Sequence, residues 1–464
     1  MRTHHAGKEV ISLNEKTMIR DLTQGSVARN LIMFSIPFVL SNLLQTLYSL
    51  VDMVVVGQFV GSVGLSAVSI GGDVLQLMTM LCMGFATAGQ IMISQYVGSG
   101  EREKIPRTIG TMFTLLLSAS IVISVICGFC SNGILNLLNT PEEALEQATA
   151  YSVTCYVGLF FIFGYNIVSA ILRGMGDGKR PLLFVAIATI TNLILDLVFV
   201  AGLGLEAFGA ALATVVAQAI SFIISIIYLY HKRESFGFDF RLRSFAVRKE
   251  QAIPLCKLGF PMALQYAAIM LSNMFVNAKI NDYGLTISAV NGVGNKLRSL
   301  TTVVVQSVGT ASSTMCGQNL GAKKFDRVSK IVHIDLLINV VYIALLCAVM
   351  LLFPTQVFGL FTSDAEVLAW APQYMPVMVV TFIGSALMTP YNSLINGLGY
   401  ASLSMVIGLL DGVVARVGLS LLLGSMWGIM GYWYGNALAG FVTVILAAAY
   451  YYSGRWRTRK LLVE

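Results

Sequence analysis

The chain has 464 residues, of which 56% are hydrophobic and only 11% are charged, with a formal net charge of +7. Soluble globular proteins carry about 25% charged residues, so this composition excludes an ordinary soluble protein and indicates a membrane protein. The 43 glycines and 10 prolines suit transmembrane helices that pack closely.

The chain begins with a polar segment, residues 1–29, which lacks the apolar core of roughly 7–15 residues found in a cleavable signal peptide. Each later membrane crossing needs about 20 apolar residues. Twelve runs of suitable length follow, at about 30–57, 65–97, 108–130, 148–172, 182–201, 208–230, 253–280, 287–317, 331–353, 367–393, 402–423 and 429–452.

The second half of the chain repeats the first. ISQYVGSGEREKI (93–105) resembles CGQNLGAKKFDRV (316–328), and Tyr151 and Tyr374 are separated by the same 223 residues. Six spans per repeat is an even number, so the two halves are parallel copies.

The expected fold is therefore an all-α polytopic membrane protein with twelve transmembrane helices in two six-helix bundles. The expected segments are a cytoplasmic N-terminal segment (1–29), an N-terminal bundle (30–230), a basic cytoplasmic linker (231–252), a C-terminal bundle (253–452) and a basic cytoplasmic tail (453–464).

Positive charge is confined to one side of this topology. All but four of the 30 Lys and Arg residues lie in or beside the N-terminal segment, the even-numbered connections, the linker and the tail. The positive-inside rule then places both termini in the cytoplasm. The basic charge is explained by topology and by contact with anionic lipid, so no nucleic-acid partner is expected.

Acidic residues inside apolar spans are expensive and indicate function. Asp196 lies about six residues from the outer turn GLGLEA, roughly 9 Å along a helix, and Asn192 is one helical turn deeper on the same face. Thr214 and Asp52 fall at a similar depth on neighbouring spans, whereas Asp73 and Asp335 lie nearer helix ends. The oxygens of Asp52, Asn192, Asp196 and Thr214 are predicted to hold Na⁺ or a proton. The alternative is that Asn192 and Asp196 only cap backbone groups or bind each other.

The second half has no copy of this layer, since Asn192 corresponds to Ala415 and Asp196 to Leu419. It carries basic residues instead, and these could line a cavity and contact a charged substrate. Candidate substrate-lining residues there are Lys296, Arg298, Asp411 and Arg416. The alternative for Asp411 is a pair with a basic neighbour that holds helices together.

Pro37 interrupts the first span, four turns before Asp52. Because proline removes a backbone hydrogen bond, Pro37 is a candidate hinge, with a static kink as the alternative. Gln45 and Tyr48, on the same span, are candidate substrate-lining residues.

Several stretches together resemble the MATE (multidrug and toxic compound extrusion) family over about residues 25–452. They are SIPFVLSNLLQTLYSLVDMVVVGQFVG, ILRGMGDGKRP, TNLILDLVFVAGLGLEAFGAALAT and GQNLGAKKFDRV. The bacterial branch with small-drug exporters and DinF-like proteins is the most similar. The resemblance implies two bundles around a V-shaped central cavity. It also implies a cation site at Asp52, Asn192, Asp196, Ala210 and Thr214, and a bending proline at Pro37.

The expected function is a secondary antiporter of the bacterial plasma membrane, which exports small amphipathic, typically cationic compounds in exchange for Na⁺ or H⁺. The alternatives are a flippase for a lipid-linked precursor and an exporter of an anionic metabolite. A monomer is expected. No cofactor is expected, because the Cys and His residues form no ligand pattern. The absence of a GxxxxGK[ST] loop disfavours an ATP-driven pump, and no enzyme activity is expected.

Overall fold

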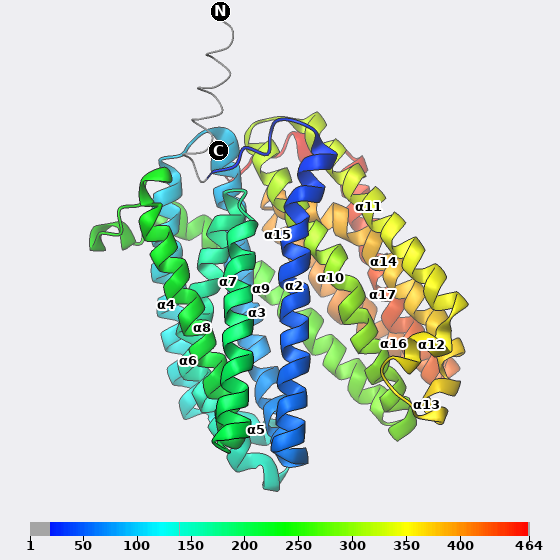
Figure 1. The fold of residues 1–464 in the computed structure, drawn as a ribbon. Helices are drawn as coiled ribbons and strands as arrows, with labels where there is room; N and C mark the ends of the chain where they lie inside the picture. The colour runs from blue at the N-terminus through cyan, green and yellow to red at the C-terminus, as the bar shows by residue number, and fades with distance from the viewer. Residues whose placement is uncertain (1–18, 139, 463–464) are drawn as a thin grey trace, which may run out of the picture. The chain divides into compact units, whose positions relative to one another are not determined.

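The computed structural model describes residues 19–138 and 140–462, so residues 1–18 of the expected N-terminal segment and the last two residues of the expected tail lie outside the described residues. This described part is almost entirely helical and contains no β-strand. Figure 1 shows the long helices in chain order, from α2 in blue to α17 in red.

The elements of the first half are α2 (Val27–Phe59), α3 (Gly61–Ser99), α4 (Lys104–Phe129), α5 (Ser131–Leu137), α6 (Glu142–Gly174), α7 (Lys179–Asp196), the π-helix η1 (Leu197–Gly202), α8 (Glu206–His231), and the 3₁₀ turns η2 (Arg233–Ser235) and η3 (Leu242–Phe245). Those of the second half are α9 (Lys249–Asn281), α10 (Leu285–Gly321), α11 (Phe325–Leu352), α12 (Pro354–Gly359), α13 (Ala365–Ala369), α14 (Ala371–Leu398), α15 (Ala401–Leu409), the π-helix η4 (Leu410–Val417), α16 (Gly418–Trp427), α17 (Ile429–Tyr452) and the 3₁₀ turn η5 (Arg455–Arg457).

Among the described residues, eleven helices are long and apolar enough to cross a membrane. One of these spans joins α7 to η1, and another joins α15, η4 and α16. The remaining long helix is α10, whose many polar residues lower its hydropathy although it has 37 residues. With α10, the long helices correspond to the twelve predicted spans, which confirms the all-helical polytopic fold.

The helices form two compact units. Within the described residues, unit 1 holds residues 19–22 and 40–259, and unit 2 holds residues 23–39 and 260–462. The division therefore falls inside α2 between Val39 and Leu40, two residues after Pro37, and inside α9 between Gly259 and Phe260, one residue before Pro261. Both divisions thus lie close to a proline, a residue that removes one backbone hydrogen bond from a helix.

Unit 1 is built around α6, which packs against α3 and α8. Small residues allow this close approach. A Cβ added to Gly158 of α6 would lie 2.4 Å from the Val215 side chain of α8, and one added to Gly164 would lie 2.5 Å from Phe222. Membrane helices commonly use glycine in this way, because van der Waals packing rather than water exclusion holds them together.

Unit 2 has a similar centre in α14, which packs against α10, α11 and α17. The Ser393 hydroxyl of α14 donates to the Gly309 carbonyl of α10 at 3.0 Å. Gly397 of α14 lies so close to α10 that a Cβ there would be 2.9 Å from the Ser313 carbonyl oxygen. Polar contacts and small residues thus fix the α10–α14 pair.

The connection between α6 and α7 and the segment after α8 are held by hydrogen bonds. The buried Asp177 carboxylate accepts the Lys179 and Arg180 backbone N–H groups at 3.0 and 3.3 Å and pairs with the Arg180 guanidinium at 3.2 Å. Burial raises the pKa of Asp177, and the Arg180 charge offsets part of this rise. In the linker, the Phe245 carbonyl accepts a hydrogen bond from Thr114 of α4 at 2.5 Å, which anchors η3 to unit 1.

The GYWYG stretch at the start of α17 provides a stability test for this packing. Gly431→Ala would place a Cβ 1.9 Å from the Leu423 carbonyl oxygen of α16, and backbone cannot move aside cheaply. We expect Gly431→Ala to lower the free energy of unfolding by about 1–3 kcal/mol, measured as a lower melting temperature of the purified chain in detergent.

Gly418→Ala, at the start of α16, is the matched control, because a Cβ there meets no described atom within 4 Å. Alanine favours a helix over glycine by up to about 1 kcal/mol, so this variant should melt at the wild-type temperature or above. Equal melting of the two variants would contradict the packing argument.

Candidate functional site

A cluster of polar side chains lies in unit 1, where α2, α7 and α8 meet. Asp52 comes from α2, Asn192 and Asp196 from α7, and Thr214 from α8. Asn192 and Asp196 share one face of α7 and are only 2% and 1% exposed. The carboxylates of Asp52 and Asp196 are close enough for their charges to interact. The structure thus brings together the four residues that the sequence placed at one depth.

Thr214 connects the three helices of this cluster. Its hydroxyl accepts a hydrogen bond from Asn192 Nδ2 at 3.4 Å. The same hydroxyl lies 2.9 Å from the Tyr48 hydroxyl of α2, and one of the two donates to the other. Tyr48, which the sequence suggested only as a substrate-lining residue, therefore belongs to the polar cluster and fixes α2 against α8.

Several oxygens of this cluster are buried and unpaired. Within the described part of the chain, neither carboxylate oxygen of Asp196 has a hydrogen-bond partner, and the same holds for Asp52 Oδ1 and Asn192 Oδ1. Buried polar atoms are nearly always paired, and an uncompensated carboxylate costs several kcal/mol in low-dielectric surroundings. The arrangement therefore fits a bound monovalent cation or a proton, since either one supplies the missing positive charge.

Apolar packing encloses the cluster. Ala210, one turn before Thr214 on α8, is fully buried and belongs to an apolar group that includes Val56 of α2, Cys155 of α6 and Val200 of η1. Asp196 itself is only 1% exposed.

The helix geometry changes directly after Asp196. Here α7 ends and the π-helix Leu197–Gly202 begins. Single π turns inside α-helices occur frequently at functional sites, because the wider turn shifts the hydrogen-bond register and re-aims nearby side chains. After the π-helix, the Leu205 N–H group donates a hydrogen bond to the Phe199 carbonyl at 2.9 Å. Asp196 is therefore the last residue of the regular α-helix before the wider π turns begin.

Two further positions on these helices are informative. Gln218 lies one turn after Thr214 on α8, and its buried Oε1 has no partner among the residues that the structure describes. Its i, i+4 spacing from Thr214 puts both side chains on one face of α8, and this spacing can be seen in the sequence. Gln45, by contrast, is exposed on α2 and contributes nothing to the cluster.

Unit 2 contains a separate charged group. Nη2 of Arg416, in η4, lies 3.2 and 3.1 Å from the two carboxylate oxygens of Asp411. Nη1 donates to Asn436 of α17 at 2.5 Å and to Asn273 of α9 at 3.4 Å. Asp411 thus pairs with a basic neighbour of its own helix, and the contacts to α9 and α17 come from Arg416.

Arg298 of α10 lies close enough to Arg416 and Tyr374 for electrostatic interaction. Its guanidinium forms no hydrogen bond or ion pair with any described residue. Lys296, two residues earlier, is exposed, and residues two apart do not share a helix face. Two guanidinium groups and one carboxylate therefore leave a net positive charge beside Tyr374.

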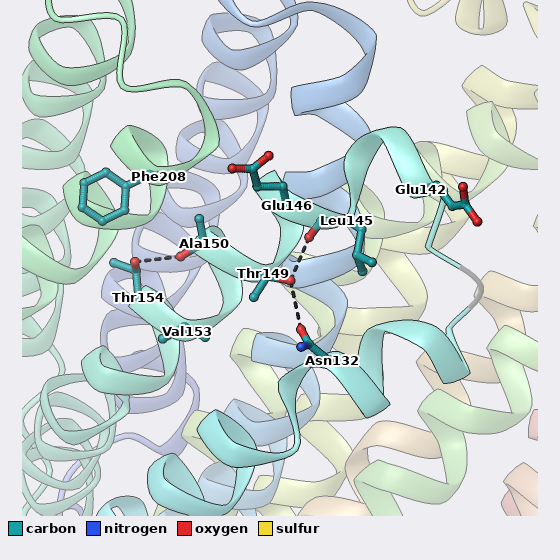
Figure 2. Close-up of a pocket in the computed structure, with 9 residues that line it drawn as sticks. All are labelled: Asn132, Glu142, Leu145, Glu146, Thr149, Ala150, Val153, Thr154 and Phe208. Carbon is teal, nitrogen blue, oxygen red and sulfur yellow. Dashed lines mark hydrogen bonds between the residues drawn. The ribbon is translucent and has the colours of Figure 1, made fainter.

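An open hollow of about 710 Å³ lies on unit 1 between the start of α6, Asn132 of α5 and Phe208 of α8. Figure 2 shows Thr149 of α6, whose hydroxyl donates to the Leu145 carbonyl at 2.8 Å and to Asn132 Oδ1 at 3.5 Å. The residues of the Asp196 cluster do not line this hollow, so it is separate from the candidate site.

Comparison with known proteins supports a transporter. The profile of the MatE family matches residues 37–198 and 261–422, at nearly the spacing of the internal repeat. The probable multidrug resistance protein YpnP of Bacillus subtilis (strain 168) is 29% identical over 445 residues, which cover 96% of this chain and 99% of that protein. A protein named FAD transporter, from Shewanella oneidensis, is 25% identical over 399 residues, covering 84% and 86%.

A solved structure has the same fold. It is a MOP superfamily transporter from Pyrococcus furiosus, described as having a binding pocket of reverse polarity that suggests a different function. It is 21% identical, covers 95% of this chain and 98% of that one, and superposes with a TM-score of 0.88. The family match covers most of the chain in two repeated segments, and the chain therefore belongs to the MATE family of multi-pass membrane transporters.

Proposed function

We propose that this protein is a secondary antiporter that exports small amphipathic organic compounds in exchange for Na⁺ or H⁺. The observation that carries this proposal is the pair of buried Asp196 and half-buried Asp52, with its buried and unpaired oxygens. The names of relatives such as the probable multidrug resistance protein YpnP support an organic substrate. As the positive-inside pattern predicts, we place both termini in the cytoplasm of a bacterial cell.

The coupling follows from electrostatics. With the site empty, Asp52 and Asp196 repel each other in surroundings that disfavour charge. A bound Na⁺ or proton removes this cost, so the cation stabilises the conformation in which the cluster is closed. Tyr48, held by Thr214, transmits the state of the site to α2, which carries Pro37.

Asp196→Asn tests this coupling, because it keeps the shape of the side chain and removes the charge. In proteoliposomes with separately imposed Na⁺ and H⁺ gradients, we expect wild type to move a fluorescent organic compound with one of the two gradients. We expect Asp196→Asn to lose that gradient-driven component entirely. The gradient that drives wild type identifies the coupling ion.

Asp73→Asn is the control, since Asp73 is a span acid that lies exposed on α3, and it should retain wild-type transport. Equal gradient-driven transport by wild type and Asp196→Asn would refute a coupling role for the cluster.

Thr214 offers a finer test of the network. Thr214→Val keeps the side-chain volume but leaves Asn192 Nδ2 and the Tyr48 hydroxyl without their shared partner. A lost hydrogen bond of about 1–1.5 kcal/mol should raise the half-saturating concentration of the coupling ion about tenfold in the same transport assay. Thr214→Ser retains the hydroxyl and should stay near wild type, whereas similar values for Val and Ser would show that the hydroxyl has no part in ion binding.

A second candidate function is export of an organic anion, and the charged group of unit 2 favours it. Beyond the unpaired Arg298, the buried Arg416 Nε and Trp433 Nε1 lack acceptors among the described residues. The Trp433 ring packs 4.7 Å from Tyr374, and Tyr374 interacts with Arg298. Unused donors and excess positive charge suit a carboxylate or phosphate group. The relative named FAD transporter supports this class of substrate.

Arg298→Gln tests the anionic substrate, with Lys296→Gln as the control because Lys296 is exposed nearby on the same helix. For a fluorescent carboxylate, loss of a charge-assisted contact of at least about 1.5 kcal/mol should raise KM about tenfold or more in Arg298→Gln and leave Lys296→Gln unchanged. Unchanged KM in both variants would remove the anionic candidate. If Arg298→Gln impairs the transport of organic cations and leaves that of the carboxylate unchanged, multidrug export is the one of these two candidate functions that remains.

A further inference from the structure

We propose that unit 2 holds a second binding site for a monovalent cation, formed by Asp335, Asn339 and Ser312. The sequence placed Asp335 nearer a helix end and gave it no role. In the structure, Asp335 and Asn339 lie one turn apart on α11 and both are 0% exposed. Ser312 of the neighbouring helix α10 is also 0% exposed, and its hydroxyl lies beside the Asp335 carboxyl.

The oxygens of this group are incompletely paired. Asn339 Nδ2 donates to Asp335 Oδ1 at 2.8 Å. Asp335 Oδ2, Asn339 Oδ1 and Ser312 Oγ are buried without a hydrogen bond of good geometry to any described residue. Three acceptor oxygens of one small group are therefore left unused, which is rare in folded proteins.

The surroundings do not supply a counter-charge from the described residues. The titratable side chain that interacts with Asp335 is the Cys316 thiol, one turn after Ser312 on α10. His333, two residues before Asp335, is exposed, and its Nε2 lies 3.4 Å from the Tyr451 hydroxyl. Since an isolated buried carboxylate is unstable, Asp335 requires a positive charge from outside the protein.

The donor set indicates which cation fits. Carboxylate, amide and hydroxyl oxygens are ligands for hard cations, and a single carboxylate balances one positive charge. This favours Na⁺ over a divalent ion. The O and N atoms of an Asn amide are assigned from the hydrogen bonds they form. When the Asn339 amide is rotated by half a turn, its Oδ1 faces the Asp335 carboxylate and becomes available to the cation. The resulting set matches the chemistry of Asp196, Asn192 and Thr214 in unit 1.

The two sites are distinct in the fold. The proposed site belongs to α10 and α11 of unit 2, whereas the Asp196 cluster belongs to α2, α7 and α8 of unit 1. Asp335 lies ten residues after the start of α11 at Phe325, about 15 Å along the helix, and Lys323 and Lys324 directly precede that start. The proposed site is therefore nearer the basic end of its helix, which the topology assigns to the cytoplasm.

Equilibrium binding of radioactive Na⁺ to the purified full-length chain in a mildly alkaline, Na⁺-free buffer tests this site. Asp335→Asn should bind one Na⁺ per chain fewer than its parent, both in wild type and in the Asp196→Asn background. This difference does not depend on whether unit 1 couples to Na⁺ or to H⁺, so the outcome is independent of the proposed antiport. Ser312→Ala should keep the site and weaken its affinity about tenfold.

Asp73→Asn is again the control and should bind as much Na⁺ as wild type, because Asp73 is exposed. If Asp335→Asn does not fold, Ser312→Ala and Asn339→Ser carry the test through their weaker Na⁺ affinity and their smaller Na⁺-dependent rise in melting temperature. Unchanged Na⁺ stoichiometry in a folded Asp335→Asn, or unchanged affinity in both other variants, would overturn the proposal and show that Asp335 permanently carries a proton.

Discussion

The cost of burying the Asp196 carboxylate beside Asp52 is the constraint on which the rest of unit 1 depends. A second negative charge nearby raises this cost, because like charges interact strongly where water is scarce. Only a bound cation or a proton relieves it without changing the fold. The occupancy of the site therefore changes the free energy of the surrounding helices, which is the physical requirement for an ion to drive transport.

The helices of unit 1 pack closely around the Asp196 cluster. Ala210 of α8 is fully buried in an apolar group that includes Val56 of α2 and Val200 of η1. Thr214 contacts Tyr48 and Asn192 through one hydroxyl, so the three helices share a polar contact beside Asp196. Tyr48 belongs to α2, which is also a helix in which the division between the two units falls.

Much of this arrangement could be predicted from the sequence. Counting residues from a loop gives the depth of a side chain, and i, i+4 spacing gives its face, so Asn192, Asp196, Thr214 and Asp52 were found. Counting residues does not show how a helix is rotated about its axis, and this rotation decides which side chains face the neighbouring helices. It could not show that Tyr48 forms a hydrogen bond with Thr214 while Gln45 is exposed.

Depth from a helix end also fails when the helix is longer than the bilayer is thick. The sequence predicts that Asp335 lies near a helix end, yet α11 begins at Phe325 and Asp335 is completely buried. The division of α2 and α9 between the units depends on contacts between distant residues. A local pattern such as Pro37 indicates where bending is easy, without showing to which unit each half of the helix belongs.

The internal repeat sharpens the case for two separate sites. At the repeat offset of 223 residues, Asp335 and Ser312 correspond to Met112 and Gly89. Met112 and Gly89 are also in contact in unit 1. A Cβ added to Gly89 would lie 2.2 Å from Cε of Met112. The same position between two helices is therefore filled by an apolar thioether in one unit and by a carboxylate and a hydroxyl in the other.

The reverse holds for the Asp196 cluster. Asn192 and Asp196 correspond to Ala415 and Leu419, and Ala415 is buried in unit 2. Each unit thus keeps a polar group where its copy has an apolar one, at a different place in the shared fold. Duplication alone would have produced matching residues at matching places. Two non-equivalent buried acids, each surrounded by amide and hydroxyl oxygens, are better explained by two separate needs for positive charge, one in each unit.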